Sequence, residues 1–555
     1  MRARDQAKSR LYFLSVTKPS KTSFIMKILY RSYLLLLCLL LSSPAFAQRY
    51  VDIAASNDPT NLPDLLDIIR GDTTATGERN DNNTIYRLEN GGTFVFTGII
   101  RNTPEWPLQI QAQDLTNLDT KPVIIGQPNS SGSYPNFARP EGDVTFRNLW
   151  IVLGDNGPLN NHKFGSFRLS GPNTRAIFQD CILEKDRGGM VQVRANGVKI
   201  YMDNCILRNG GNRRLLQGNG RGIDFREFTV DTLVMRNTVV HNIVDRFLRS
   251  QGTSEPHNYV EIDHCTAFNQ SGRHGFIQLS RVRTAKITNN LFINPIMAGT
   301  TPAFTDEQNQ PDSATHKVIT LDTLYSDTDL IISNNNIFWT QEIIDFWNGI
   351  DSVSAPGVLS DLVKQILGAD TTNAYFSEVL TLEDVPQSIF QYVQDLYADP
   401  TSTEMFDIIV EDSVVAGTIL DSGNLYDFDN FSPCYPATTQ SATADTDGGP
   451  IGAVTACANL ASSIWGPVIG EFAFRVSPNP AHGTARFSFE LEQAGPISLH
   501  IYDLSGRMVS LVQAGIAAPG PQEREWQVPA DLAPGMYLAR LQTSQGVQAL
   551  RLMIQ

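Results

Sequence analysis

Residues 260–268, Val-Glu-Ile-Asp-His-Cys-Thr-Ala-Phe, contain the pattern that decides the fold of this chain. Apolar residues alternate with other residues, a turn residue and a small residue follow, and a second apolar stretch comes after them. The pattern occurs seven times, with its turn residue at positions 148, 180, 204, 237, 264, 289 and 334. Two short strands joined by a sharp bend, repeated at uneven steps, predict the rungs of a parallel β-solenoid with variable loops.

The turn position of these copies is filled by residues suited to a tight bend. Five of the seven are Asn, one is Asp and one is His264. Asn and Asp tolerate the left-handed backbone conformation, and stacked Asn amides can bond from rung to rung as a ladder. The next position holds Cys181, Cys205 and Cys265, which suit a packing column. We therefore interpret His264 and Cys265 as scaffold residues and not as a catalytic pair.

Residues 1–47 have the features of a secretory signal peptide. The apolar run 34–41 follows Lys27 and Arg31, and Ala45-Phe46-Ala47 forms a cleavage site. Met26 is the expected start, and Cys38 lacks the small-residue motif of a lipoprotein. Of the remaining cysteines, Cys434 and Cys457 bracket an irregular segment and are candidates for a disulfide in an oxidising compartment.

The mature chain is strongly acidic. Residues 1–47 contain eight Lys and Arg but one Asp, which leaves 35 basic against 57 acidic residues and a net charge of −22. This balance argues against nucleic acid as a partner. No later run is long enough for a membrane span, and we expect a monomer.

The order of patterns predicts four regions. Residues 48–83 form an N-terminal cap with a helix at 61–71, and the β-helix extends over 84–460. A helical insertion interrupts it at about 340–425, with helices expected at 358–367 and 388–397. A strand at 423–428 and a Gly-rich turn at 445–452 end the solenoid, and residues 472–555 form a small β-sandwich.

The C-terminal region carries specific motifs. They are Pro478-Asn-Pro480, Tyr502-Asp-Leu-Ser-Gly-Arg507, Leu532-Ala-Pro-Gly-Met-Tyr537 and the ending Arg551-Leu-Met-Ile554. These residues resemble the type A C-terminal sorting domain of the type IX secretion system, with Arg551 where Lys is commoner. The resemblance implies the type IX machinery as a partner, export across the outer membrane, and then proteolytic removal with release or surface attachment.

The repeated rungs resemble the right-handed parallel β-helix of the pectate-lyase-like proteins. Residues 260–264, Val-Glu-Ile-Asp-His, are similar to the pectate lyases' Val-Trp-Ile-Asp-His, with Glu261 in place of Trp. We transfer no catalytic role from this match, because function must be argued from the site. In this fold family the substrate groove follows the strands that precede the opening pattern.

Those preceding strands place polar residues on one face. The strands are expected at 166–170, 191–194, 223–226, 246–249, 277–281 and 319–322. Because side chains alternate across a strand, the outward column consists of Arg168, Gln192, Asp224 and Gln278. Arg194, Arg226, Arg249 and Arg281 lie close to this column. Such a face is suited to an acidic polysaccharide, whose carboxylates pair with guanidinium groups.

Lyase chemistry on a uronate polymer needs a base and a group that neutralises the carboxylate. Arg194 and Arg226 are our candidates for these roles, although an Arg base needs a strongly lowered pKa. The alternative is that these arginines form inter-rung ion pairs with Asp224, Glu227 and Asp245. Ca²⁺, which assists pectate lyases, is a candidate cofactor, with Asp224 or Glu227 as its ligands.

Two other functions stay open. A polygalacturonase-like hydrolase uses the same fold with paired carboxylates, and Arg273-His274-Gly275 is faintly similar to the Gly-His-Gly of that family. The Asn-Thr-Asp and paired-Asp motifs of that family are missing here. A non-catalytic carbohydrate-binding or adhesion protein needs no activated residue and is compatible with the sequence.

Overall fold

The computed structural model describes the chain from residue 48 onward, with gaps. The described residues are 48–58, 60–128, 135–152, 167–211, 219–250, 255–272, 274–301, 317–385, 389–399, 431–446, 448–455, 457, 460, 474–491, 495–502, 508–529, 532–543 and 546–555. The expected signal peptide and the expected strand at 423–428 lie outside them.

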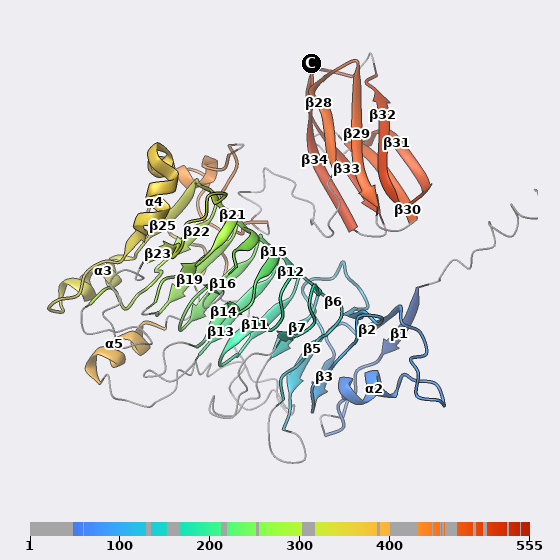
Figure 1. The fold of residues 1–555 in the computed structure, drawn as a ribbon, viewed down its shortest axis with the longest axis horizontal. Helices are drawn as coiled ribbons and strands as arrows, with labels where there is room; N and C mark the ends of the chain where they lie inside the picture. Colours follow the sequence, from blue (N-terminus) through green and yellow to red (C-terminus); the bar gives the residue numbers. More distant parts are fainter. Residues whose placement is uncertain are drawn as a thin grey trace, which may run out of the picture. The chain divides into compact units, whose positions relative to one another are not determined.

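Three parallel sheets form a β-helix, as the repeated pattern predicts (Figure 1). Among the described residues, the strands of the first sheet are, in spatial order, β1 (Arg49–Ile53), β2 (Thr84–Leu88), β4 (Leu108–Ala112), β6 (Val144–Arg147), β9 (Arg175–Gln179), β12 (Val198–Asp203), β15 (Val230–Arg236), β18 (His257–Asp263), β21 (Val282–Thr288) and β24 (Asp329–Ser333).

The second sheet follows each bend of the opening pattern. Its described strands are β3 (Thr93–Phe96), β5 (Val123–Gly126), β7 (Trp150–Val152), β10 (Ile182–Glu184), β13 (Ile206–Gly210), β16 (Val239–Ile243), β19 (Thr266–Gln270), β22 (Leu291–Ile293), β25 (Asn335–Phe338) and β27 (Tyr375–Phe376).

The third sheet precedes the first sheet in each rung. Its described strands are β8 (Phe167–Leu169), β11 (Gly189–Val193), β14 (Arg221–Arg226), β17 (Leu248–Ser250), β20 (Ile277–Gln278), β23 (Lys317–Thr320) and β26 (Gly357–Leu359). One rung therefore passes from the third sheet through the first to the second, for example β11, β12 and β13.

The bends between the first and second sheets have the predicted backbone. All seven turn residues, His264 included, have φ between 47° and 58°. Their amides bond to the preceding rung, but not always to its turn residue. Asn204 Nδ2 donates to Asp180 Oδ1 at 2.6 Å, whereas Asn237 Nδ2 donates to Asp203 Oδ1 at 2.9 Å. The predicted ladder is thus a mixed one, because Asp203 stands one position before its turn.

A second Asn column lies where the chain leaves the second sheet. Asn209, Asn242, Asn269 and Asn294 have φ between 53° and 58°. The amides of Asn242, Asn269 and Asn294 each donate to the Asn of the preceding rung, at distances of 3.5, 3.4 and 3.1 Å. This ladder was not predicted, although each of its residues comes five positions after a turn residue of the opening pattern.

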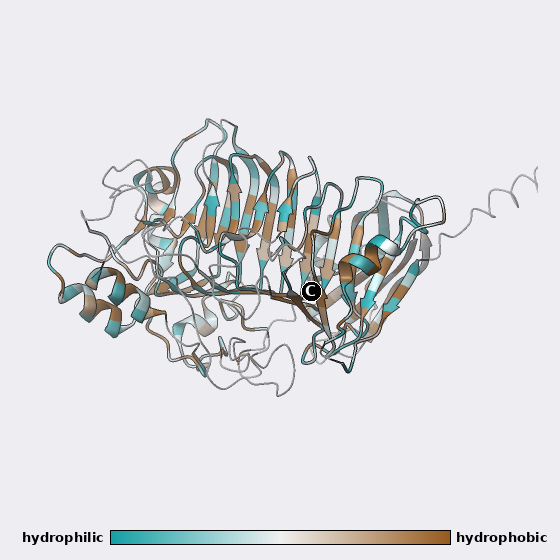
Figure 2. Ribbon diagram, turned by 90° about the horizontal axis from the view of Figure 1, so that it is seen from below, coloured by the Kyte–Doolittle hydropathy of each residue, from teal (hydrophilic) through white to brown (hydrophobic). Residues whose placement is uncertain are grey.

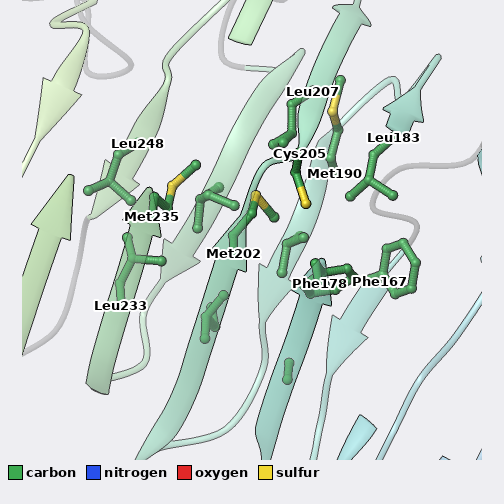
Figure 3. Close-up of a cluster of buried hydrophobic side chains, with 14 of the residues drawn as sticks. Phe167, Phe178, Leu183, Met190, Met202, Cys205, Leu207, Leu233, Met235 and Leu248 are labelled. Carbon is green, nitrogen blue, oxygen red and sulfur yellow. The ribbon is translucent and has the colours of Figure 1, made fainter. Parts of the chain in front are cut away.

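Apolar side chains from all three sheets fill the solenoid. Figure 2 shows hydrophobic and hydrophilic segments alternating along the strands, as expected when one side of each strand faces the core. In Figure 3, Met202 and Cys205 lie among Leu207 and Leu183 in this interior. Cys181, Cys205 and Cys265 are all buried and free, which confirms their column as packing.

Helices cover both ends of this core. Helix α2 (Leu65–Gly71) begins at Leu65, later than the expected residue 61, because Asp64 caps it by accepting from Leu66 N at 2.9 Å. At the other end, α4 (Asp361–Leu367) buries Val363 and Leu367 against the same core. The prediction of helix from residue 358 was wrong, because 357–359 instead form β26, with Leu359 paired to Ile319 of the third sheet.

Two further helices pack together beside the solenoid. Helix α5 (Phe390–Ala398) lies within the expected region, whereas α3 (Gln341–Asn348) was not expected. Phe346 of α3 contacts Phe390 of α5 with ring centroids 5.1 Å apart. Trp347 Nε1 donates to Met297 O at 2.8 Å, which ties the pair to a rung.

Residues 431–446, 448–455 and 457, which we call the strap, cover the outer side of the second sheet. The disulfide between Cys434 and Cys457 is formed. Phe268, Leu291 and Phe338 pack against the strap in one buried cluster.

Hydrogen bonds also fasten the strap to the bends. Ala453 N donates to Thr266 Oγ1 at 2.9 Å, and Gly452 N donates to Asn289 O at 2.8 Å.

The C-terminal domain is a separate β-structure with its own core. Its described strands are β28 (Arg475–His482), β29 (Thr484–Leu491), β30 (Gly495–Tyr502), β31 (Met508–Ala517), β32 (Gly520–Gln527), β33 (Gly535–Thr543) and β34 (Gly546–Ile554). Their pairs are antiparallel except β28 with β34. Phe487, Leu499, Ile501 and Leu541 are fully buried between them.

Candidate polyanion-binding face

The outward side of the third sheet brings most of the candidate residues together. Strand register places Arg168 beside Gln192, Gln192 beside Asp224, and Asp224 beside Arg249. Leu248 pairs with Ile277, so Gln278 continues the same column. The expected column is present, and Arg249 is a member of it, not merely a neighbour.

Two arginines that sequence reasoning missed extend this column. Single bridges join Ile100 to Ala138 and Ala138 to Phe167. Arg101 and Arg139 therefore line up with Arg168. An apolar or small residue followed by Arg, in all three places, is the signal that could have found them. Arg101 and Arg139 were missed because the stretches around them pair only through isolated bridges and lack the alternating pattern of a strand.

Arg194 and Arg226 lie at the ends of β11 and β14, beside the column. Arg194 Nη2 donates to Gln192 Oε1 at 2.9 Å. Arg226 has φ 48° after an irregularity in β14, and its backbone N donates to Asp224 Oδ1 at 3.1 Å. Within the described part of the chain, no carboxylate pairs with the guanidinium groups of Arg139, Arg194 or Arg226.

Burial and mutual repulsion lower the pKa of several of these guanidinium groups. Burial, then Arg139 and Arg194, lower the pKa of half-buried Arg168 to about 10. Burial, followed by the charge of Arg226, lowers the pKa of Arg194. Burial and Arg101 lower the pKa of Arg139. Burial is the largest cause of all three pKa shifts, and the additional effect of neighbouring guanidinium groups shows that positive charges lie close to one another on this face.

The acidic residues near this face are buried and already paired with other arginines. Asp224 lies 3.0 Å from Arg221 Nη1 and 3.7 Å from Arg249 Nη1. The expected ion pairing therefore occurs for Arg249 and for Arg221, which sequence reasoning did not consider. It does not involve Arg194 or Arg226.

Asp245 is the centre of the adjoining buried network. Its carboxylate is 2.8 Å from Arg221 Nε, 2.8 Å from His274 Nδ1 and 3.8 Å from Arg246 Nη1. Burial alone would raise the pKa of Asp245, but Arg246, His274 and Arg221 together hold it far below its usual range. The network joins the start of β14 to the segments that precede β17 and β20.

The other candidates occupy ordinary positions. Arg281 Nε donates to Thr323 Oγ1 at 3.3 Å, and Gln278 is half-buried. His264 is buried between Asp263 and Asp445, which is consistent with a scaffold role. Arg273 lies outside the described residues.

The residues present do not fit a Ca²⁺ site. The Asp224 carboxylate already contacts two guanidinium groups, and Glu227 is an exposed single carboxylate. Ca²⁺ takes six to eight oxygen ligands. Among the described residues, no three or more His, Cys, Asp or Glu side chains are grouped to hold a metal ion.

Comparison with known proteins identifies the C-terminal domain. Residues 475–555 match the family described as secretion system C-terminal sorting domain. The protein is therefore exported by type IX secretion to the cell surface or beyond, and the secretion machinery is a partner. No curated protein matches the chain. No helix among the described residues is long and apolar enough to span a membrane.

Proposed function

We propose that the β-helix binds an acidic polysaccharide along the arginine face, defined as Arg101, Arg139, Arg168, Arg194 and Arg226. The observation that carries this proposal is the row of guanidinium groups on successive rungs, three of which have no carboxylate partner among the described residues. An unneutralised cationic row is unusual on a chain with a net charge of −22 after residue 47. Its natural ligand is a polymer of carboxylates.

The regular spacing of the solenoid supports a polymeric ligand. Neighbouring parallel strands lie about 4.8 Å apart, so equivalent side chains repeat along the axis at that distance. Arg101, Arg139 and Arg168 follow this repeat. A chain that carries a carboxylate on each sugar would meet one guanidinium fork after another.

β-Elimination is the reaction that this face would support. A base removes the proton next to the uronate carboxylate, the electron pair forms a carbon–carbon double bond, and the glycosidic C–O bond breaks toward the leaving sugar. The leaving oxygen then takes up a proton. Arg194 is the candidate base, since burial and Arg226 lower its pKa. Arg226 would neutralise the carboxylate, which makes the carbon acid easier to deprotonate.

A second candidate function is binding without catalysis. The observation that favours it is the bond from Arg194 Nη2 to Gln192 Oε1, which holds one side of the guanidinium in place. A donor held in this way presents its remaining N–H groups to a ligand. The guanidinium of an adhesion or carbohydrate-binding protein would bind the ligand in this way without losing a proton.

The test is incubation of the purified protein with pectate, alginate and glycosaminoglycans, followed by ultraviolet absorbance from unsaturated uronate. We expect absorbance with at least one polymer, and its loss in Arg194→Ala and Arg226→Ala at unchanged melting temperature. Arg175→Ala is the matched control, because Arg175 lies on the first sheet with its own partner, Asp143, at 3.4 Å.

Each other outcome has a distinct meaning. Retention on a glycan affinity gel, lost in the two arginine variants but without absorbance, would establish the binding protein. New reducing ends without unsaturation would favour the hydrolase. If both variants merely lower the melting temperature and keep glycan binding, the arginines are structural and the proposal fails.

A further inference from the structure

A depression of about 540 Å³ opens at the corner where the chain passes from the third sheet to the first. It lies beyond the arginine face, because Gly197 and Thr229 of its wall come three residues after Arg194 and Arg226. Its polar and charged lining residues include Asn173, Lys199, Asp231, Glu255, Asn258 and Arg283. A volume of roughly 300–1,000 Å³ is typical of small-molecule sites.

The charges of this lining balance each other. Two cationic and two anionic side chains face the depression, and Lys199 Nζ lies 3.9 Å from Asp231 Oδ2. Asn258 Nδ2 donates to Asp231 Oδ1 at 2.7 Å, and Arg283 pairs with Asp327. A site with compensated charges does not select an ion. Carboxylate acceptors beside amide and ammonium donors instead suit hydroxyl groups, which both donate and accept.

The wall of the depression is built from stacked turns. Gly197 has φ +76°, and a Cβ added there would lie 2.2 Å from Asn173 Oδ1, so this close approach requires glycine. Asn196 Oδ1 accepts from Thr229 N at 2.9 Å on the next rung. Such a rigid wall needs little ordering when a ligand binds.

The opposite side presents an aligned polar row. Thr232 pairs with Tyr259 and Tyr259 with Thr284, so the preceding residues Asp231, Asn258 and Arg283 lie side by side on three strands. Three polar side chains about 4.8 Å apart on neighbouring strands can together contact one or two sugar rings.

We infer that this corner depression is a binding site for a neutral, hydroxyl-rich sugar. It is distinct from the arginine face, which takes carboxylates. The Asp231 carboxylate and the Asn258 amide bind hydroxyl groups, and the stacked turns position the sugar ring.

The test is calorimetric titration of the purified protein with neutral cello-, xylo-, manno-, galacto- and arabino-oligosaccharides up to the millimolar range. We expect at least one of them to bind. Asn258→Trp fills the depression from an exposed position, and Asp231→Ala removes the central acceptor. Each should weaken binding at least about tenfold, as expected for a lost hydrogen bond to a charged group.

Two controls separate this site from the arginine face. Asp329→Ala removes an exposed carboxylate at the start of β24, outside the depression, and should leave affinity unchanged. Arg194→Ala should also retain the neutral sugar, even if it abolishes binding of acidic polymers. The inference is overturned if no neutral oligosaccharide binds, or if either Asn258→Trp or Asp231→Ala binds it as the wild type does.

Discussion

At the residue scale, single side chains in left-handed turns join the rungs to one another. Asn242 and Asn269 show this best, since each is buried and bonds to the Asn of the preceding rung. Only Gly, Asn and Asp adopt this backbone routinely. His264 occupies such a place without being one of them, and it compensates by pairing with Asp263 and Asp445.

His264 should make stability depend on alkaline pH. Burial alone would lower its pKa, but bonds to Asp263 and Asp445 raise the pKa to about 9. The folded state thus holds this proton more tightly than the unfolded chain, whose His pKa is about 6.5. The stabilisation is complete below pH 6.5 and is lost as pH rises through 9, to a total of at most about 3 kcal/mol.

The measurement is urea unfolding of wild type and His264→Asn between pH 6 and 10, pH values chosen to bracket this window. The wild type should lose stability relative to the variant across the window. Burial lowers the pKa of His257 to about 4, so that residue affects only the acidic side. Parallel curves for the two proteins would show that His264 gains no proton affinity on folding.

At the element scale, the strap is held in place by a disulfide and by apolar contacts with the second sheet. It has no long strand of its own, yet Tyr435 donates to Ile451 O at 2.7 Å and both lie under the surface. The disulfide closes a loop with a sequence separation of 23. The oxidising environment met during export makes this bond available.

Replacing both Cys434 and Cys457 by Ser should destabilise the protein by about 3 kcal/mol, because the open loop regains conformational entropy in the unfolded state. The check is thermal unfolding with and without reductant. Reductant should lower the wild-type midpoint to that of the double variant and leave the variant unchanged. An equal effect of reductant on both proteins would place the cause elsewhere.

At the scale of the whole molecule, the sorting domain and the solenoid have separate hydrophobic cores. The buried cluster around Phe487 and Leu541 is separate from the solenoid core. A domain with its own core can direct secretion without contributing to a ligand site.

Removal of residues 472–555 should therefore trap the protein in the periplasm while the β-helix stays folded. Cell fractionation with an antibody to the solenoid locates the protein, and circular dichroism of the purified fragment checks its fold. The matched control is the full chain expressed in the same strain. Normal appearance of the truncated chain outside the cell would contradict the assignment of export to this domain.

Much of the architecture could be predicted because a solenoid repeats its local rules. The bend at Asn204 and the packing residue Cys205 follow from neighbours in sequence, and stacking multiplies the signal. The second ladder through Asn242 was not predicted, although its residues come at a constant five positions after the turn residues that were. Helix was expected from residue 358 because the apolar residues of 358–367 repeat at helical spacing. Residues 358 and 359 instead form part of a strand that pairs with β23.

The sequence predicted the residues at the centre of the candidate face. It did not predict the additional arginines at one end of the face or the buried ion-pair network next to it. Arg168, Gln192 and Asp224 alternate within strands, so their side followed from local pattern. Arg101 and Arg139 join through single bridges. The network of Arg221, Asp245 and His274 joins residues up to 53 positions apart.

The sequence by itself determined the repeat, the direction of side chains along each strand, the export signal and the existence of two kinds of domain. These properties depend on local backbone preference and periodicity, which are written in consecutive residues. Only the tertiary structure decided which charges neutralise one another. Asp224 pairs with Arg221 and Arg249, while no carboxylate among the described residues pairs with Arg194 or Arg226. Which charged side chains form ion pairs depends on distances and burial between rungs, and these cannot be read from the residues of a single strand.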